Sequence, residues 1–352
     1  MQDTHSPATQ SERQPMYKWI AISTIIIAIG VSGACFTSHQ KRTENESCSK
    51  DYPLLDQYID CETINEKIVR VKNLEIEVSR LIEQKKQHNK ILRASVFYRD
   101  LDSRRWFGIN ADEHFYPASL LKLPISIAYY KLAEANPEIL NKKVTIPENQ
   151  TDQNAKQYFA VKSNIQPGGE YTIETLLKNR IEYSDNNPIQ VLNQNLPAEY
   201  SYNVLRDLGL PEPEMYNGKS NWNMTVRLYA GILRTLYITS YLTPAYSQQL
   251  LSYLTESKFN DGIRAVIPKN IKVAHKFGEA ALLNPDSTVE TRVLHDCGIV
   301  YNPNNPYIIC IMTSGNDIKE MLQTIQDIAK IVDGSVLSDL YEDEKVDIKD
   351  DE

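Results

Sequence analysis

The placement of strand-like segments at both ends of one helical stretch is the feature that most constrains the fold. Five runs rich in β-branched and aromatic residues are bounded by turn signals: residues 94–99, 105–109, 271–276, 292–301 and 307–313. Between the second and third runs, residues 119–256 read as helices interrupted by Pro- and Gly-bearing loops. We therefore expect an α/β (α+β) fold, in which an antiparallel sheet is built from both ends of the domain, with flanking helices and an inserted all-helical lobe.

Amphipathic patterns precede and follow this unit. Between residues 63 and 88, apolar side chains recur at three- and four-residue steps: Ile64, Ile68, Val71, Leu74, Val78, Leu81 and Ile82. This spacing predicts an amphipathic helix, which packs on the domain or pairs with a second copy as a short coiled coil. A final amphipathic helix is expected over residues 317–332, and the acidic residues that follow are expected to form a solvated tail.

An uncharged segment near the N-terminus predicts a membrane anchor. The eighteen residues 19–36 carry no charge, and that length is just sufficient to cross a bilayer. Basic residues lie on both sides of the segment, so the positive-inside rule does not orient it. The expected organisation is a polar tail 1–18, a transmembrane anchor 19–36, a stalk 37–61, a working domain 62–333 and an acidic tail 334–352.

Charge and cysteine spacing argue against several classes of function. The formal net charge is −8 at pH 7 without a basic stripe, which argues against a nucleic-acid binder. The five cysteines form no CxxC pair and no His/Cys cluster, so we expect no metal and no other cofactor. Cys48 and Cys61 follow the apolar segment and could form a disulfide outside the cell. Cys297 and Cys310 lie in apolar, strand-like runs and are expected to be buried thiols.

A serine and a lysine three residues apart form the first candidate for chemistry. They stand in the segment Ser119-Leu120-Leu121-Lys122. A serine hydroxyl is a poor nucleophile until a neighbour accepts its proton, and on a helix residues three apart share a face. A lysine in a partly desolvated cleft can have a lowered pKa and act as that base. Taken alone, the pattern is equally typical of a helix start with a surface lysine.

Two further polar motifs follow in order. Ser184-Asp185-Asn186 precedes an apolar, helix-like run, where it could also be a helix N-cap. Lys276-Phe277-Gly278 ends the run that begins at residue 271, where a strand terminus with a glycine turn is the plainer interpretation. Each motif is a weak signal by itself, but the order of all three is specific.

Ser-x-x-Lys, Ser-Asp-Asn and Lys-x-Gly in this order resemble the signature of the class A β-lactamases and penicillin-binding proteins. The surrounding segments also resemble that superfamily and its β-lactamase-related serine hydrolases: residues 116–122, 224–230, 273–276 and 295–301. The resemblance covers about three quarters of the chain. It implies a β-lactamase/transpeptidase-like fold, with the active site between the sheet and the helical lobe, and a catalytic domain outside the cytoplasm.

The resemblance also implies a role for each motif residue. Ser119 would be the acylated nucleophile, Lys122 its proton-transfer partner, and Ser184 the group that passes a proton to the leaving nitrogen. Asn186 would hold the substrate amide, and Lys276 would provide positive charge for a substrate carboxylate. The backbone N–H groups of Ser119 and of a residue just past Gly278, assigned to Ala280, would form the oxyanion hole.

Two departures from the family pattern bear on substrate binding and turnover. Phe277 stands where the family carries a Thr or Ser hydroxyl that binds the β-lactam carboxylate, and such a bond is worth about 1.5–3 kcal/mol. The family's omega-loop Glu-x-x-Leu-Asn segment has no counterpart between Asn186 and Thr225. The nearest acids, Glu212 and Glu214, are the possible deacylation acids, but they do not fit its spacing and also read as exposed loop residues. Slow deacylation is therefore expected.

Three functions remain open at this point. The leading one is an active-site serine hydrolase of the class A β-lactamase type that acts on β-lactams or related amides. The second is a penicillin-binding-protein-like peptidase or acyltransferase that acts on cell-wall peptides. The third is a catalytically quiet wall-binding module that retains the fold. The sequence identifies neither the natural substrate nor the oligomeric state.

Overall fold

The computed structural model describes residues 64–347, apart from 156, 160–161, 217–218, 285–287 and 304. The N-terminal helix, the first hairpin and the C-terminal elements are α3 (Ile64–Gln87), β1 (Arg93–Asp100), β2 (Trp106–Ile109), β7 (Val273–Leu283), β8 (Val289–Val300), β9 (Tyr307–Gly315) and α11 (Ile318–Asp347). The stretch between β2 and β7 contains η1 (Ala118–Leu121), α4 (Lys122–Ala135), α5 (Glu138–Asn141), β3 (Lys143–Thr145), β4 (Glu170–Thr172), α6 (Ile173–Glu182), α7 (Ile189–Asn195), α8 (Ala198–Asp207), β5 (Glu214–Tyr216), β6 (Lys219–Asn221), α9 (Val226–Tyr237), α10 (Pro244–Thr255) and η2 (Ile263–Ala265).

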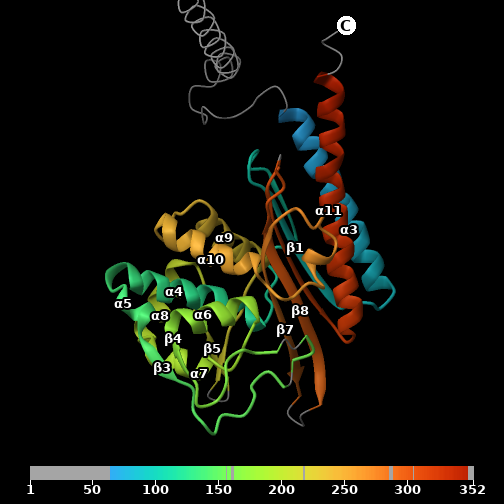
Figure 1. Ribbon diagram of the computed structural model, residues 1–352. Helices are drawn as coiled ribbons and strands as arrows, with labels where there is room; N and C mark the ends of the chain where they lie inside the picture. Colours follow the sequence, from blue (N-terminus) through green and yellow to red (C-terminus); the bar gives the residue numbers. More distant parts are fainter. Residues whose placement is uncertain are drawn as a thin grey trace, which may run out of the picture. The chain divides into compact units, whose positions relative to one another are not determined.

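One five-stranded antiparallel sheet joins the two ends of the domain. Its strand order is β2-β1-β9-β8-β7, and β1 pairs with β9 so that Phe97 lies opposite Cys310. The helices of the inserted stretch gather beside this sheet (Figure 1). The expected antiparallel sheet built from both termini, with an inserted helical lobe, is therefore confirmed. β7 runs on to Leu283, so Gly278 lies inside a strand and not in the expected turn after Lys276.

The two faces of the sheet contribute to two different apolar cores, as the alternation of side chains along a strand requires. On β1, Phe97 packs into the core shared with the helical lobe, whereas Tyr98 packs into the core under α3 and α11. α3 and α11 lie on the same side of the sheet in Figure 1. From α3, Val78 and Ile82 are buried there. The expected helix over residues 63–88 therefore packs on its own domain.

The C-terminal helix is longer than its sequence pattern predicted. α11 begins near the expected residue, but it continues to Asp347, through much of the stretch that was expected to be a solvated tail. Val332, where the expected helix ended, is buried in the core under α3 and α11. The α11 side chains after residue 334 are outside the described ones, and only the backbone shows the additional helical length. Glu342, Glu344 and Lys345 in this part are long-chain residues, which favour helix.

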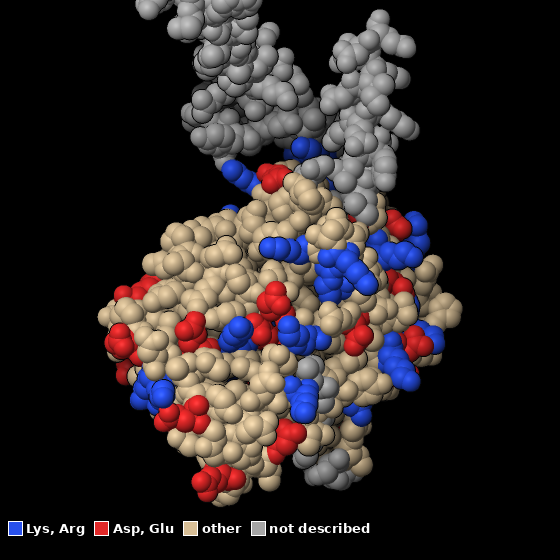
Figure 2. Space-filling view, viewed as in Figure 1, with Lys and Arg blue, Asp and Glu red and all other residues tan. Residues whose placement is uncertain are grey.

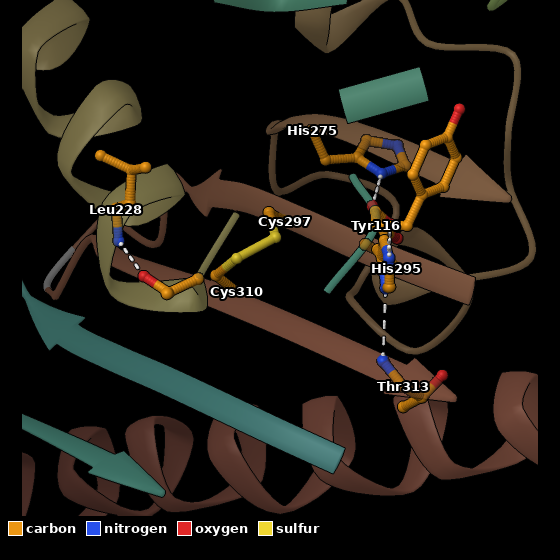
Figure 3. Close-up of a disulfide and its surroundings, with 9 residues drawn as sticks. Tyr116, Leu228, His275, His295, Cys297, Cys310 and Thr313 are labelled. Atoms are coloured by element: carbon orange, nitrogen blue, oxygen red, sulfur yellow. Dashed lines mark hydrogen bonds and ion pairs between the residues drawn. A yellow bond between two sulfur atoms is a disulfide. The ribbon is translucent and has the colours of Figure 1, made fainter. Parts of the chain in front are cut away.

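The two cysteines expected to be buried thiols are joined to each other. Cys297 on β8 and Cys310 on β9 lie directly opposite in the strand register and form a disulfide, shown in Figure 3. The expectation of burial is correct, since both are fully buried, but the expectation of free thiols is wrong. Strand periodicity assigns each cysteine to a strand, whereas the register that makes the two face each other is a property of the folded sheet.

The membrane-anchor segment 19–36, the stalk, Cys48 and Cys61 lie outside the described residues. Within residues 64–347, apart from the gaps given above, no helix is both long enough and apolar enough to cross a bilayer. On the face seen in Figure 2, Lys and Arg side chains are interspersed with Asp and Glu.

The disulfide generates a stability prediction. Replacing both cysteines (Cys297→Ala with Cys310→Ala) should lower the free energy of unfolding by about 2–4 kcal/mol, because the cross-link restricts the unfolded chain. Urea unfolding under oxidising conditions measures the change. A reductant should destabilise the wild type by a similar amount and should leave the double variant unchanged. Equal stability of the oxidised wild type and the double variant would contradict the prediction.

Candidate active site

The turn that carries Ser119 is held against the edge strand of the sheet. Ser119 lies in the 3-10 turn η1, half-buried, with Ala118 before it at a left-handed φ of 48°. A non-glycine residue with that φ is strained. β7 approaches this turn closely: a Cβ added to Gly278 would lie 2.9 Å from the Pro117 carbonyl oxygen and 3.2 Å from the Leu120 nitrogen. Glycine is therefore required at 278 for the strand to reach the nucleophile turn.

Lys122 starts α4 directly after that turn and points into the protein. Only 3% of its surface is exposed, and its Nζ donates hydrogen bonds to Ser184 Oγ at 3.1 Å and Asn186 Oδ1 at 2.7 Å. A third, shorter bond joins Nζ to the Ser184 carbonyl oxygen. Among the described residues, no carboxylate is hydrogen-bonded to this ammonium. The first two motifs, which are sixty-odd residues apart in the sequence, are thus in direct contact.

Lys276 reaches the same serine from the opposite side. Its Nζ donates to Ser184 Oγ at 2.9 Å and to the Phe277 carbonyl oxygen at 2.9 Å, and the side chain is fully buried. Ser184 is 1% exposed, with a left-handed φ of 53°. The structure therefore brings Lys122, Ser184, Asn186 and Lys276 together, one turn away from Ser119.

The loop between β3 and β4 supports the Ser-Asp-Asn segment. Asp185 is buried, and its Oδ1 accepts hydrogen bonds from Asn154 Nδ2 at 2.8 Å and from the Asn187 backbone N–H at 2.9 Å. Asn154 Oδ1 in turn accepts the backbone N–H of Asn186 at 2.8 Å. Asp185 therefore stabilises the turn through hydrogen bonds, while Ser184 and Asn186 on either side of it contact the lysines.

Burial lowers the pKa of both lysines. Desolvation is the largest cause at Lys122, and the nearby charges of Lys276 and Arg180 lower its pKa further, against the opposing effects of Asp185 and Glu279. Desolvation also lowers the pKa of Lys276 to about 7, opposed by Asp296 and assisted by Arg180. A buried amine with a depressed pKa holds its proton weakly. Burial therefore disfavours the charged form of both lysines.

Arg180 is a buried charge near the two lysines that the sequence motifs did not identify. It lies on α6 four residues before Ser184 and is 3% exposed. Among the described residues, its Nε and Nη1 atoms have no hydrogen-bond partner. Its positive charge lowers the pKa of both lysines. A lone Arg in an amphipathic helix pattern carries no sequence signal that distinguishes it from a surface arginine.

His295 is a second residue that the sequence motifs did not identify, and it is hydrogen-bonded to the segment just before η1. Its Nε2 lies 2.9 Å from the Tyr116 carbonyl oxygen, and its Nδ1 accepts the Thr313 backbone N–H at 3.3 Å, as drawn in Figure 3. The ring must therefore carry its proton on Nε2 and is neutral. Burial lowers the pKa of His295 to about 4. His295 on β8 is therefore hydrogen-bonded to the segment that leads into η1.

The third motif places an aromatic ring where the resemblance implies a hydroxyl. Phe277 is 2% exposed, and its ring stacks on Phe259 with centroids 4.1 Å apart. Its carbonyl oxygen accepts from Lys276 Nζ and so is directed away from β8. Because strand residues two apart have the same orientation, the N–H of Glu279 faces the cleft side as well. This alternation favours the backbone N–H of Glu279 as the oxyanion donor on β7. The assignment of that role to Ala280 was made from the sequence and stays a prediction.

The two loop acids lie in the segment after α8. The side chain of Glu212 is exposed there, and among the described residues it makes no hydrogen bond to Lys122 or Ser184. Glu214 is the first residue of β5, and its side chain is outside the described ones. The role of either acid in deacylation stays a prediction.

The neutral, buried His295 generates a prediction about pH. The pKa of His295 falls from 6.5 to about 4 on folding, so the unfolded chain binds the extra proton, and stability falls as the pH drops from 6.5 to 4. The loss approaches ~3 kcal/mol at the low end. His295→Gln should remove this component from the pH dependence of urea unfolding. The carboxylates are shared by both proteins, so an identical pH slope in the two would contradict the assignment.

Known proteins resemble this chain over most of its length. A family model described as the Beta-lactamase enzyme family matches residues 73–336. A search of the curated proteins finds no match. Among solved structures, a variant of PBP-A in an acyl-enzyme complex with penicillin G superposes with a TM-score of 0.63 at 20% identity, over 76% of this chain and 97% of that chain.

Two β-lactamases have similar folds. The β-lactamase from Sphaerobacter thermophilus gives a TM-score of 0.61 at 19% identity, over 73% of this chain and 95% of that chain. An ancestral class A β-lactamase gives 0.60 at 19% identity, over 74% and 99%. These likenesses show the shared fold. Since the family model spans the sheet, the helical lobe and all three motifs, this chain belongs to the Beta-lactamase enzyme family.

Proposed function

We propose that this protein is an active-site serine acyl-transfer enzyme that forms an acyl-enzyme with β-lactams or related amides and releases it slowly. The observation that carries the proposal is the convergence of Lys122 and Lys276 on Ser184 Oγ, at 3.1 and 2.9 Å, inside a buried site. Two buried amines on one hydroxyl are costly for stability. They are useful where a proton must move between groups.

The proposed acylation assigns one step to each motif. Lys122 accepts the Ser119 proton, and Ser119 Oγ adds to the substrate carbonyl carbon. Backbone N–H groups of Ser119 and β7 stabilise the oxyanion. When the tetrahedral intermediate collapses, the C–N bond breaks, and Ser184 donates its proton to the leaving nitrogen. Lys122 returns the first proton to Ser184, so that the site ends with an ester on Ser119 and no net change in protons.

Deacylation has no comparable support. It needs a base that activates water at the ester, and the hydrogen bonds of Lys122 go to Ser184 and Asn186, with no carboxylate among its described partners. Losing a positioned general base typically slows a step by about 10²–10⁴-fold. The same lack favours a second candidate, a penicillin-binding-protein-like acyltransferase on cell-wall peptides, in which an amine and not water would receive the acyl group.

Time-resolved intact-mass analysis tests this function. Incubation with benzylpenicillin and, separately, with its methyl ester should produce a covalent adduct with one or both donors. The adduct should form in a burst and then decay slowly, because acylation is supported and water activation is not. Ser119→Ala should form no adduct. Equal labelling of the variant would remove Ser119 from its role, burst-free rapid turnover would contradict slow deacylation, and absence of any adduct would favour the catalytically quiet wall-binding module.

We further propose that residues 19–36 anchor the chain and that the catalytic domain lies outside the cytoplasm. The uncharged segment supports the anchor, and the Cys297–Cys310 disulfide supports an oxidising compartment. The full chain should therefore fractionate with membranes and require detergent, whereas a chain lacking residues 1–38 should be soluble and retain Ser119 labelling. Recovery of the uncleaved full chain in the soluble fraction would show the anchor to be wrong.

A further inference from the structure

One face of β7 carries side chains that are unsuited to binding an anionic substrate group. Along a strand, residues two apart share a face, so Phe277 and Glu279 lie on one face of β7. Gly278, on the opposite face, touches the turn of Ser119. A phenyl ring and a carboxylate therefore share one face of β7. The Phe277 carbonyl oxygen accepts from Lys276 Nζ, and the charge of Glu279 affects the pKa of Lys122 and of Lys276, so both residues lie beside the lysine cluster, where the resemblance implies binding of a carboxylate.

The phenyl ring belongs to a closed aromatic cluster. Phe277 stacks on Phe259, and Phe159 packs edge-on against both, with ring centroids 5.1 Å from Phe259 and 6.3 Å from Phe277. Phe277 and Phe259 are each 2% exposed. Such a cluster offers no hydrogen-bond donor to an anion, and its buried rings leave little space for one.

The ammonium of Lys276 is already engaged. It donates to Ser184 Oγ and to the Phe277 carbonyl oxygen, and it lies 4.5 Å from the centroid of the Phe277 ring. The pKa of Lys276 is lowered to about 7 by burial, so its charge is partly lost at neutral pH. The cation expected to attract a carboxylate is therefore both partnered and weak.

Glu279 adds a negative charge at the same place. Its side chain is partly buried, and its Oε1 accepts the backbone N–H of Phe159 at 2.9 Å. This bond ties the loop that carries Phe159 to β7, beside the site. A carboxylate held there repels a second carboxylate, and at partly desolvated positions the repulsion is stronger than in water.

We propose that Glu279 is a specificity-determining residue that makes this site select acyl donors with a neutral or cationic group beside the scissile amide, and reject donors with a carboxylate there. The inference rests on the proposed Ser119 acylation and adds to it the charge class of the substrate. The chemistry of Phe277, Lys276 and Glu279 supports it jointly, since the first supplies no donor, the second has little free charge, and the third is repulsive.

A pair of donors that differ only in this charge tests the proposal. Acylation rates of Ser119 with benzylpenicillin and with its methyl ester are measured by intact mass, each divided by the donor's rate of hydroxide hydrolysis. The wild type should favour the ester roughly tenfold or more. Glu279→Gln keeps the size of the side chain and an oxygen for the Phe159 N–H, and it should raise the acid-to-ester rate ratio roughly 10- to 100-fold.

Glu290→Gln provides a matched control, because Glu290 is an exposed acid on β8 and its removal changes the net charge equally. This variant should leave the ratio unchanged. An equal gain for both donors in Glu279→Gln would overturn the proposal, because it would make Glu279 only a tether for the loop. An unchanged ratio would overturn it as well. Failure of both donors to label Ser119 would instead overturn the proposed function on which the inference rests, whereas labelling by the acid and not by the ester would overturn the inference alone.

The wild type alone supplies an independent measurement if Glu279→Gln does not fold. The 2-aminoethyl ester of benzylpenicillin carries a cation near the position of the lost carboxylate, and it should acylate Ser119 at least as fast as the methyl ester. A normalised ranking in which the free acid is fastest and the cationic ester slowest would overturn the proposal.

Discussion

Two lysine ammonium groups share one serine hydroxyl inside the protein, and the rest of the structure is arranged around that contact. Lys122 and Lys276 both donate to Ser184 Oγ, and both are almost completely buried. Burying two amines so close together is unfavourable unless at least one gives up its proton easily. The depressed pKa values of both lysines are the consequence. In the proposed acylation, this weakly held proton is what allows Lys122 to act as the proton acceptor for Ser119.

The sheet provides Lys276 for this contact, and the helical lobe provides Lys122 and Ser184. β7, as the edge strand, brings Lys276, and its Gly278 permits van der Waals approach to the nucleophile turn. The lobe brings Lys122 at the start of α4 and Ser184 after α6. Ala118 and Ser184 both adopt left-handed backbone conformations, each of which costs about 1–3 kcal/mol. Packing at the junction of sheet and lobe must supply that free energy.

Acylation, recognition and release are served by different residues, so the chain can depart from its family in the last two and keep the first. The lysine–serine cluster retains direct hydrogen bonds among Lys122, Ser184 and Lys276, on which the proposed acyl transfer depends. Phe277 and Glu279 alter the surface that a substrate carboxylate would meet, and Lys122 has no carboxylate among its described hydrogen-bond partners. The physical expectation is an enzyme with an ordinary first step, an unusual substrate preference and a slow second step.

Local patterns in the sequence predicted the main helices and strands and the sheet's origin at both ends of the domain. The order of three short motifs, and its resemblance to a known superfamily, identified the candidate residues Ser119, Lys122, Ser184, Asn186 and Lys276. Periodicity and short motifs are local properties, and these elements depend on little else. Only the tertiary structure decided which side chains face one another. Cys297 meets Cys310 through strand register, and His295 reaches Tyr116 across 179 residues of chain. Arg180 and Glu279 influence the lysines through burial and proximity. These are contacts between segments that are distant in the sequence, and they exist only once the chain has folded.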